Sequence, residues 1–216
     1  MTQVGHVIYL HGFASSPAGS KATRFGRELR QRGIPYDCPD LNEPSFETLT
    51  VSRMLDQTRA AIESATTRVA LVGSSLGGFV AVHAAAQDRT GKIDRLVLLA
   101  PALDFGGNRL RQLGEHGIEE WRRSGSLRVY HYAHDAYRDV GFALYEDAAA
   151  YDAFTVTLTQ PALVFQGEND ASVDPRMVER WAADRPNVDL RLLEDDHHLT
   201  SSVDLIWKQS AAFFGL

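Results

Sequence analysis

The sequence predicts an α/β fold, with a mostly parallel sheet of about six strands and helices on both faces. Three observations lead to this prediction. Short apolar runs alternate with longer segments of helical periodicity along most of the chain. This alternation implies right-handed crossovers, which make the strands parallel. Polar residues follow four of the apolar runs, and in such sheets ligands bind at the carboxyl ends of the strands.

Four strands and three helices are expected in the first half of the chain. The strands are short apolar runs at residues 7–10, 34–38, 69–72 and 93–100. The helices are segments with apolar residues at helical spacing, at residues 20–32, 46–64 and 76–88. Gly33 is a stop signal for the first helix, and Pro101 ends the fourth strand.

Two more strands and a closing helix are expected in the second half. The strand pattern returns at residues 161–165 and 188–193, and residues 202–214 have the pattern of an amphipathic helix. Residues 102–159 interrupt the alternation, with helix-like stretches at 117–123 and 138–151. We interpret residues 102–159, the cap segment, as a small helical insertion over the carboxyl edge of the sheet. The whole chain, residues 1–216, is then a single domain.

Composition excludes several classes of protein. Of the 216 residues, 44% are apolar and 23% are charged, which is ordinary for a globular domain. The net charge of −6 argues against nucleic acid as a partner, because affinity for its backbone depends on clustered Lys and Arg. Cys38 is the only cysteine, which excludes an intramolecular disulfide and a thiolate metal cluster.

The sequence carries no recognisable targeting or membrane signal. Its first residues have neither the basic region nor the long apolar region of a signal peptide. The apolar runs are too short to span a bilayer. We therefore expect a cytoplasmic protein with no membrane span.

A glycine-rich motif directly follows the third apolar run, Gly73-Ser74-Ser75-Leu76-Gly77-Gly78. A buried strand that ends in G-x-S-x-G and opens into a helix is the pattern of a nucleophile elbow. The register selects Ser75, because for Ser74 the glycine positions would hold the large residues Val72 and Leu76. The motif therefore predicts a serine hydrolase with Ser75 as its nucleophile.

A serine nucleophile needs a base, and the base needs a carboxylate to orient it. In this fold class the chain order is serine, acid, histidine. Asp170, which follows the fifth predicted strand, is the expected acid. Asp174 is the alternative, although its place before Pro175 and a helix also suits an N-cap. Glu168 is closer to the strand and is interpreted as a loop residue.

The expected base is His197, which follows the sixth predicted strand. In this arrangement Leu199 would turn inward. His198 is the alternative, because a one-residue error in the strand boundary would exchange the two histidines.

Two backbone N–H groups are expected to hold the oxyanion of the tetrahedral intermediate. One is that of Leu76, directly after the nucleophile. The other is expected from the loop after the first strand, where Phe13 is the candidate and Gly12 lets the loop approach closely. Such chemistry needs no cofactor.

Other polar and aromatic residues have simpler explanations. His11 is expected to shape the oxyanion loop rather than to react. His131, His134 and Asp135 could be metal ligands, but a partly exposed cap explains them better, and no metal site is expected. The aromatic residues Tyr130, Tyr132 and Tyr137 could form the core of the cap segment. An alternative is that some of them line an acyl pocket together with Phe13.

Two motifs together resemble a known family. The segment at residues 9–17 reads Tyr-Leu-His-Gly-Phe-Ala-Ser-Ser-Pro and is followed by Lys21. With the elbow around Ser75, it is similar to small bacterial α/β-hydrolase esterases that open with His-Gly-Phe-x-Ser-Ser-Pro. Asp170 and His197 are in register with that family. The resemblance implies an α/β-hydrolase fold without the two leading antiparallel strands of larger members, and activity on a carboxylic ester or thioester.

The expected function is hydrolysis of a small ester or thioester through an acyl-enzyme. One alternative is a serine peptidase or amidase that acts on small substrates. Another is a ligand-binding protein on the same fold without catalytic activity. The order of Ser75, Asp170 and His197 favours an enzyme.

Overall fold

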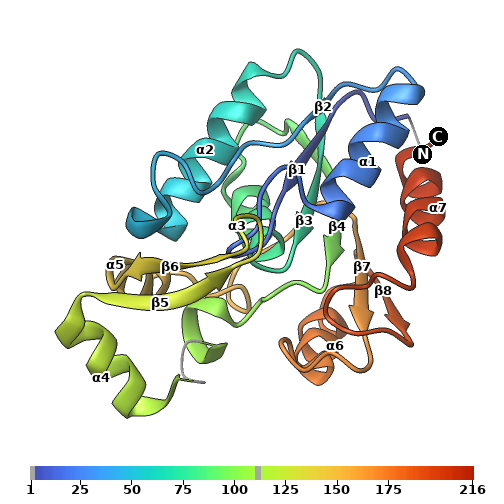
Figure 1. The fold of residues 1–216 in the computed structure, drawn as a ribbon. Coiled ribbons are helices and arrows are strands. Elements are labelled where there is room, and N and C mark those ends of the chain that lie inside the picture. The colour runs from blue at the N-terminus through green and yellow to red at the C-terminus, as the bar shows by residue number, and fades with distance from the viewer. Residues whose placement is uncertain (1–2, 110–112) are drawn as a thin grey trace.

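A computed structural model describes residues 3–109 and 113–216 and contains a six-stranded sheet (Figure 1). Its strands are β1 (Val7–Leu10), β2 (Tyr36–Asp37), β3 (Val69–Ser74), β4 (Ile93–Leu99), β7 (Ala162–Gly167) and β8 (Val188–Leu193). They are ordered β2-β1-β3-β4-β7-β8, and every pair of neighbours is parallel. The predicted fold class is confirmed.

Helices cover both faces of this sheet, and each face has its own apolar core. The helices are α1 (Ser20–Gln31), α2 (Val51–Ser64), α3 (Leu76–Gln87), α6 (Pro175–Ala183) and α7 (Val203–Phe214). Alternate strand residues such as Ile8 and Leu98 pack with α2, α3 and α6. The residues between them, such as Tyr9 and Val97, pack with α1 and α7. Among the described residues, no helix is both long and apolar enough to cross a membrane.

The helix expected at residues 46–64 is divided into two. The first part is the short 3₁₀ helix η1 (Phe46–Thr48), and the second is α2. Thr50 lies between them in an extended conformation, and its side chain accepts a hydrogen bond from the Arg53 N–H at 3.2 Å. A threonine that caps a helix in this way cannot also continue one from the preceding residues.

The cap segment mixes helices with a hairpin. It contains the π-helix η2 (Phe105–Arg109), α4 (Gly114–Ser124), the antiparallel strands β5 (Ser126–His131) and β6 (Ala136–Gly141), and α5 (Ala143–Ala148).

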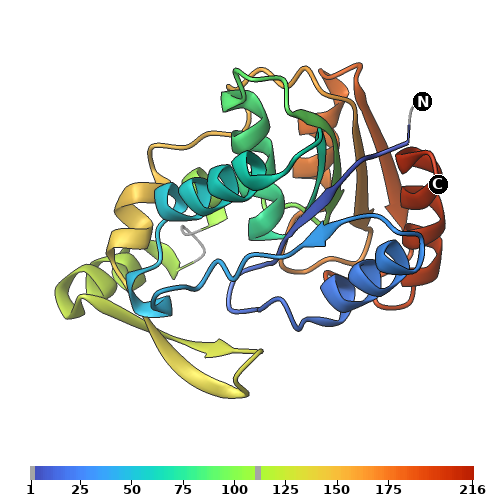
Figure 2. The same cartoon turned by 90° about the horizontal axis from the view of Figure 1, so that it is seen from above.

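The prediction of a helix at residues 138–151 is wrong for its first four residues, which belong to β6. Strand β5 alternates between more and less exposed side chains, with period two, and its registered partner is β6. Figure 2 shows this hairpin as an arm that extends away from α4 and α5. Residues 110–112 of the predicted cap segment lie outside the described residues.

Candidate active site

Ser75 forms the turn between β3 and α3. Its backbone has φ 53° and ψ −114°, in a region that a residue with a side chain rarely adopts. The turn is held in the sheet, because the Ser75 N–H donates to the Leu99 carbonyl at 2.9 Å. The Ser75 carbonyl accepts from the N–H groups of Gly78 at 2.9 Å and Ala102 at 3.1 Å. Strain of this kind costs about 1–3 kcal/mol and is typical of functional sites.

The glycines on either side of Ser75 are required by close packing. A Cβ atom on Gly73 would lie 2.4 Å from the Gly77 carbonyl oxygen. A Cβ atom on Gly77 would lie 2.0 Å from the carbonyl oxygen of Leu10, in the neighbouring strand β1. Any larger residue at either position would have to displace backbone, so the spacing of the motif follows from this geometry.

The structure brings Ser75, His197 and Asp170 together from the ends of three strands. His197 Nε2 is 3.1 Å from Ser75 Oγ, and His197 Nδ1 is 2.8 Å from Asp170 Oδ2. His198, the alternative base, makes no such contact with Ser75. Asp174, the alternative acid, is the N-cap of α6 and accepts a hydrogen bond from the Arg176 N–H at 3.0 Å.

Asp170 lies in a dense set of hydrogen-bond donors. Its Oδ1 accepts from the N–H groups of Ser172 and Val173, both at 2.8 Å, and its Oδ2 also accepts from Gln166 Nε2 at 2.9 Å. Burial alone would raise the pKa of this carboxyl, but the hydrogen bonds from His197, Val173 and Gln166 outweigh it and lower the pKa. Asp170 is therefore held as a carboxylate that fixes the orientation of the His197 ring.

Asp195 shapes the loop that carries His197, a role that sequence reasoning missed. It is 7% exposed, and its carboxylate accepts from the N–H groups of Asp196 and Ser202, both at 2.8 Å. These bonds fold the chain between β8 and α7 back on itself. Leu199, in the same loop, is fully buried, as expected. A single sequence gives no signal that separates Asp195 from its acidic neighbours.

The loop after β1 approaches Ser75 closely. A Cβ atom on Gly12 would lie 3.3 Å from Ser75 Cβ, so this position also favours glycine. Phe13 follows it and packs on Phe46, with ring centroids 5.3 Å apart. Leu76 is the first residue of α3, directly after Ser75. Of the two residues predicted to hold the oxyanion, Phe13 therefore follows the glycine that approaches Ser75, and Leu76 follows Ser75 in the chain.

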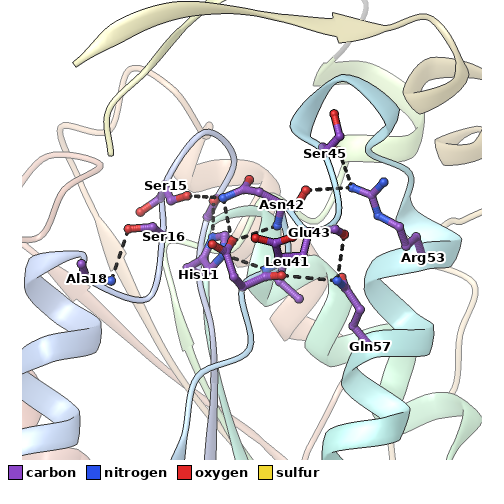
Figure 3. A network of polar contacts seen from close by, with 12 residues as sticks. His11, Ser15, Ser16, Ala18, Leu41, Asn42, Glu43, Ser45, Arg53 and Gln57 are labelled. Carbon is purple, nitrogen blue, oxygen red and sulfur yellow. Dashed lines mark hydrogen bonds and ion pairs between the residues drawn. The ribbon is translucent and has the colours of Figure 1, made fainter. Parts of the chain in front are cut away.

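A polar network holds this loop in place (Figure 3). The Gly12 carbonyl can only accept, so His11 Nδ1 carries a proton and donates to it at 2.9 Å. His11 Nε2 lies 3.0 Å from the Leu41 nitrogen and 3.2 Å from Asp40 Oδ1. Asp40 Oδ1 accepts from the Asn42 side chain at 2.8 Å, and the same amide donates to the Ser15 carbonyl at 2.7 Å. His11 and Asn42 thus fix both ends of the loop that contains Phe13.

A cavity of about 710 Å³ opens at Ser75. Of the predicted pocket residues, Phe13, Tyr130 and Tyr132 line it together with His197. Tyr137 does not line it, which corrects that prediction. It faces Tyr130 across the hairpin, with ring centroids 5.6 Å apart, and is 63% exposed.

The histidines of the hairpin make no metal centre with Asp135. His131 is fully buried, with its ring edge against Phe46 at a centroid distance of 4.7 Å. The Asp135 carboxylate instead accepts a hydrogen bond from the Tyr130 hydroxyl. Within residues 3–109 and 113–216, no three His, Cys, Asp or Glu side chains are grouped to hold a metal ion.

Comparison with known proteins gives one family match. The model of the Uncharacterised protein family (UPF0227) matches residues 6–214. No functionally curated protein matches the sequence.

Several solved structures share the fold over nearly the whole chain. A protein from Agrobacterium vitis S4 has 23% identity and a TM-score of 0.85, and the match covers 98% of this chain and 88% of that chain. Est1E from Butyrivibrio proteoclasticus has 20% identity and a TM-score of 0.80, with 98% and 87% covered. Est1E was also solved with ferulic acid bound. Alpha/beta hydrolase domain-containing protein 10 from mouse has 22% identity and a TM-score of 0.79, with 99% and 91% covered.

Proposed function

The chain belongs to Uncharacterised protein family UPF0227 and has the α/β-hydrolase fold, and we propose that it is a serine hydrolase that cleaves a small carboxylic ester or thioester. One observation carries the proposal. Ser75 Oγ, on a strained turn, lies 3.1 Å from an imidazole whose other nitrogen is 2.8 Å from a buried carboxylate. Ligand binding alone does not require a serine, a histidine and a carboxylate hydrogen-bonded in series, whereas nucleophilic catalysis does.

In the proposed first step, Ser75 Oγ attacks the carbonyl carbon of the substrate while His197 Nε2 accepts the hydroxyl proton. The Asp170 carboxylate stabilises the imidazolium that forms. The N–H groups of Phe13 and Leu76 hold the oxyanion, and the positive end of α3 adds to this stabilisation.

In the second step, His197 donates its proton to the leaving oxygen or sulfur, which leaves Ser75 acylated. A water molecule then attacks the acyl carbonyl carbon while His197 accepts one of its protons. His197 returns that proton to Ser75 Oγ as the bond between Oγ and the acyl carbon breaks, and the carboxylic acid departs. Every proton and bond in this cycle is accounted for by the three side chains and one water, so the proposed reaction needs no cofactor.

The ester class is favoured over the amide class by neighbours in fold. LipS and LipT, whose fold is similar with a TM-score of 0.72 and 22% identity, are lipolytic enzymes, and lipolysis is ester cleavage. Comparing p-nitrophenyl esters with aminoacyl anilides tests this point. Faster turnover of the anilides would overturn the ester assignment in favour of a peptidase or amidase.

The serine mechanism is tested by covalent labelling with a fluorophosphonate probe. We expect the wild-type protein to be labelled stoichiometrically, and Ser75→Ala to remain unlabelled. Ser74→Ala is the matched control, because Ser74 lies in the same motif, and it should keep its labelling. Equal labelling of wild type and Ser75→Ala in folded protein would refute the proposal.

A further inference from the structure

Lys21 lies in the wall of the cavity that opens at Ser75. It is in the first turn of α1 and lines the same cavity as Ser75 and His197. Its Nζ donates a hydrogen bond to the His198 carbonyl at 2.7 Å. An ammonium has three donors, and within the described chain this is the one hydrogen bond found for Nζ. Two N–H groups of a half-buried cation are thus available to a ligand.

The cavity lining differs in charge from the chain as a whole. The chain has 28 acidic residues and a net charge of −6, yet among the described residues no Asp or Glu lines this cavity. Burial lowers the pKa of Lys21, and Asp196, Asp195 and Asp170 partly oppose this from outside the cavity. A half-buried cation that faces an acid-free cavity is stabilised most by an anionic ligand.

Two hydroxyl groups close to Lys21 in the sequence also line the cavity. Ser16 Oγ accepts a hydrogen bond from the Ala18 N–H at 3.2 Å, which leaves its own proton free to be donated. Ser20, next to Lys21, also lines the cavity. Residues 16–21 therefore contribute an ammonium group and two hydroxyl donors to the cavity lining, where a ligand could accept hydrogen bonds from them.

The position of Lys21 relative to the base shows which part of a substrate it would meet. In ester cleavage the proton returns from the base to the leaving group, so the leaving group lies on the histidine side of the serine. Lys21 is bonded to the carbonyl of His198, the residue after the base. The Tyr132 ring bounds the same region, with its centroid 6.3 Å from that of the His198 ring.

We propose that the leaving group of the natural substrate carries an anionic group, a carboxylate or a phosphate, that binds Lys21 Nζ and the hydroxyls of Ser16 and Ser20. This inference rests on the proposed ester or thioester hydrolysis and names the class of alcohol or thiol that is released. The acyl group is held at Ser75, and the proposal does not require it to be charged.

A matched pair of esters tests the proposal, namely 4-acetoxybenzoate, with an anionic leaving group, and 4-acetoxybenzamide, its neutral counterpart. We expect wild-type kcat/KM, corrected for uncatalysed hydrolysis, to favour the anion by about tenfold or more, since a charge-assisted hydrogen bond contributes this much. Lys21→Met should abolish the preference and Lys21→Arg should largely retain it. Lys208→Met, at an exposed lysine on α7, is the control and should leave it unchanged. A third ester, 4-acetoxyphenyl phosphate, decides between carboxylate and phosphate. The anion that matches the natural leaving group should give the larger kcat/KM relative to the neutral ester.

Several outcomes would overturn the inference. If Lys21→Met lowers turnover of both esters equally, Lys21 only positions the His198 loop. If a charge preference that depends on Lys21 appears for an anionic acyl group, such as mono-4-nitrophenyl glutarate against 4-nitrophenyl pentanoate, the anion belongs to the acyl side. Should Lys21→Met fail to fold, the wild-type preference must still decrease as ionic strength rises, and a salt-independent ratio rejects the proposal. Turnover that does not depend on Ser75 refutes the proposed function itself, whereas turnover that needs Ser75 but shows no charge preference refutes only this inference.

Discussion

At the scale of single residues, the Asp170 carboxylate has two oxygens with distinct tasks. Oδ1 faces the backbone N–H groups of Ser172 and Val173, and Oδ2 faces His197 and Gln166. The backbone donors cannot rotate, so they fix which oxygen is available to the imidazole. This arrangement orients the His197 ring with Nδ1 protonated and Nε2 free to accept a proton from Ser75.

Asp170→Asn should therefore lower kcat by about 10³–10⁴-fold. The amide oxygen of Asn would be held by the two backbone N–H groups, and its NH₂ would face His197 Nδ1. This selects the tautomer with the proton on Nε2, which cannot accept one from Ser75. Initial rates with p-nitrophenyl acetate check this prediction.

Asp174→Asn is the matched control for that substitution. Asn is as good an N-cap as Asp, so α6 keeps its first turn and kcat should change little. A larger loss for Asp174→Asn than for Asp170→Asn, with both variants folded by circular dichroism, would contradict the assignment of the acid.

Local sequence patterns predict the proposed catalytic residues more successfully than the residues that support them. Ser75, Asp170 and His197 each follow a recognisable strand, and the strand ends of a parallel sheet meet at one edge. Asn42 and Lys21 instead donate hydrogen bonds to loops that are distant in the sequence. Asn42 donates to the Ser15 carbonyl, and Lys21 donates to the carbonyl of His198, 177 residues away. Their roles depend on how the loops are folded, which the local pattern does not encode.

At the scale of elements, helix α3 and strand β1 pack closely at Gly77, beside Ser75 and the loop after β1. Gly77→Ala would place a methyl group 2.0 Å from the Leu10 carbonyl oxygen, and backbone cannot yield as a side chain can. We expect the free energy of unfolding to decrease by about 3 kcal/mol or more, as overpacking of a close contact does. Urea denaturation followed by circular dichroism measures it. Gly107→Ala is the control, since a Cβ there meets nothing within 4 Å, and it should be close to neutral.

Helix α3 also carries a buried histidine that makes stability depend on pH. His83 is 2% exposed, between Phe79 and Tyr151, and burial lowers its pKa to about 4, with Asp152 partly opposing the shift. The unfolded chain binds this proton more readily, with a pKa of about 6.5. Stability from neutral His83 is therefore complete above pH 6.5 and is lost as the pH falls toward 4.

The contribution of His83 should be about 2 kcal/mol between pH 7 and pH 5, given about 1.4 kcal/mol for each unit of pKa. In His83→Phe, the difference in unfolding free energy between these two pH values should shrink by that amount. Urea titrations at both pH values provide the measurement. His116→Gln, at an exposed histidine of α4, should leave the difference unchanged. An equal effect of the two substitutions would show that burial of His83 is not the cause.

Elements buried on both faces were predictable from apolar runs, and the hairpin was not. Strands β3 and β4 are almost entirely buried, and each contains an unbroken apolar run, at residues 69–72 and 96–99. Strands β5 and β6 instead expose many of their side chains, including Tyr137. Because the less exposed face of the hairpin is for the most part only partly buried, its sequence resembles that of a polar helix or loop until the cross-strand pairing is known.

At the scale of the whole molecule, hydrogen bonds join the cap segment to two helices that cover one face of the sheet. Asp147 of α5 accepts a hydrogen bond from the Ser52 N–H of α2 at 2.8 Å. Trp181 Nε1 of α6 donates to the Ala153 carbonyl at 2.8 Å. Trp121, within the cap segment, belongs to the same apolar core as α2 and α3. The interruption of the strand–helix alternation marked this segment in the sequence, but its contacts with the rest of the chain did not follow from that.

These contacts lead us to expect that the cap segment and the sheet unfold as one cooperative unit. The chain has three tryptophans, of which Trp121 lies in the cap segment and Trp207 in α7 on the opposite side of the sheet. In a Trp181→Phe, Trp207→Phe double variant, the remaining fluorescence reports on the cap segment alone, while far-UV circular dichroism reports on the whole protein. Because the cap segment shares the apolar core of α2 and α3, both signals should give the same urea midpoint in this variant.

The reciprocal variant, Trp121→Phe with Trp181→Phe, serves as the control, because the fluorescence of Trp207 should also coincide with its own circular dichroism. Comparing two signals within each variant removes the effect of the substitutions on stability itself. A Trp121 transition at lower urea than the circular dichroism transition would mean that the cap segment opens by itself. The cavity wall formed by the hairpin would then be a movable lid, and selection of substrates would depend on its closure rather than on a fixed shape.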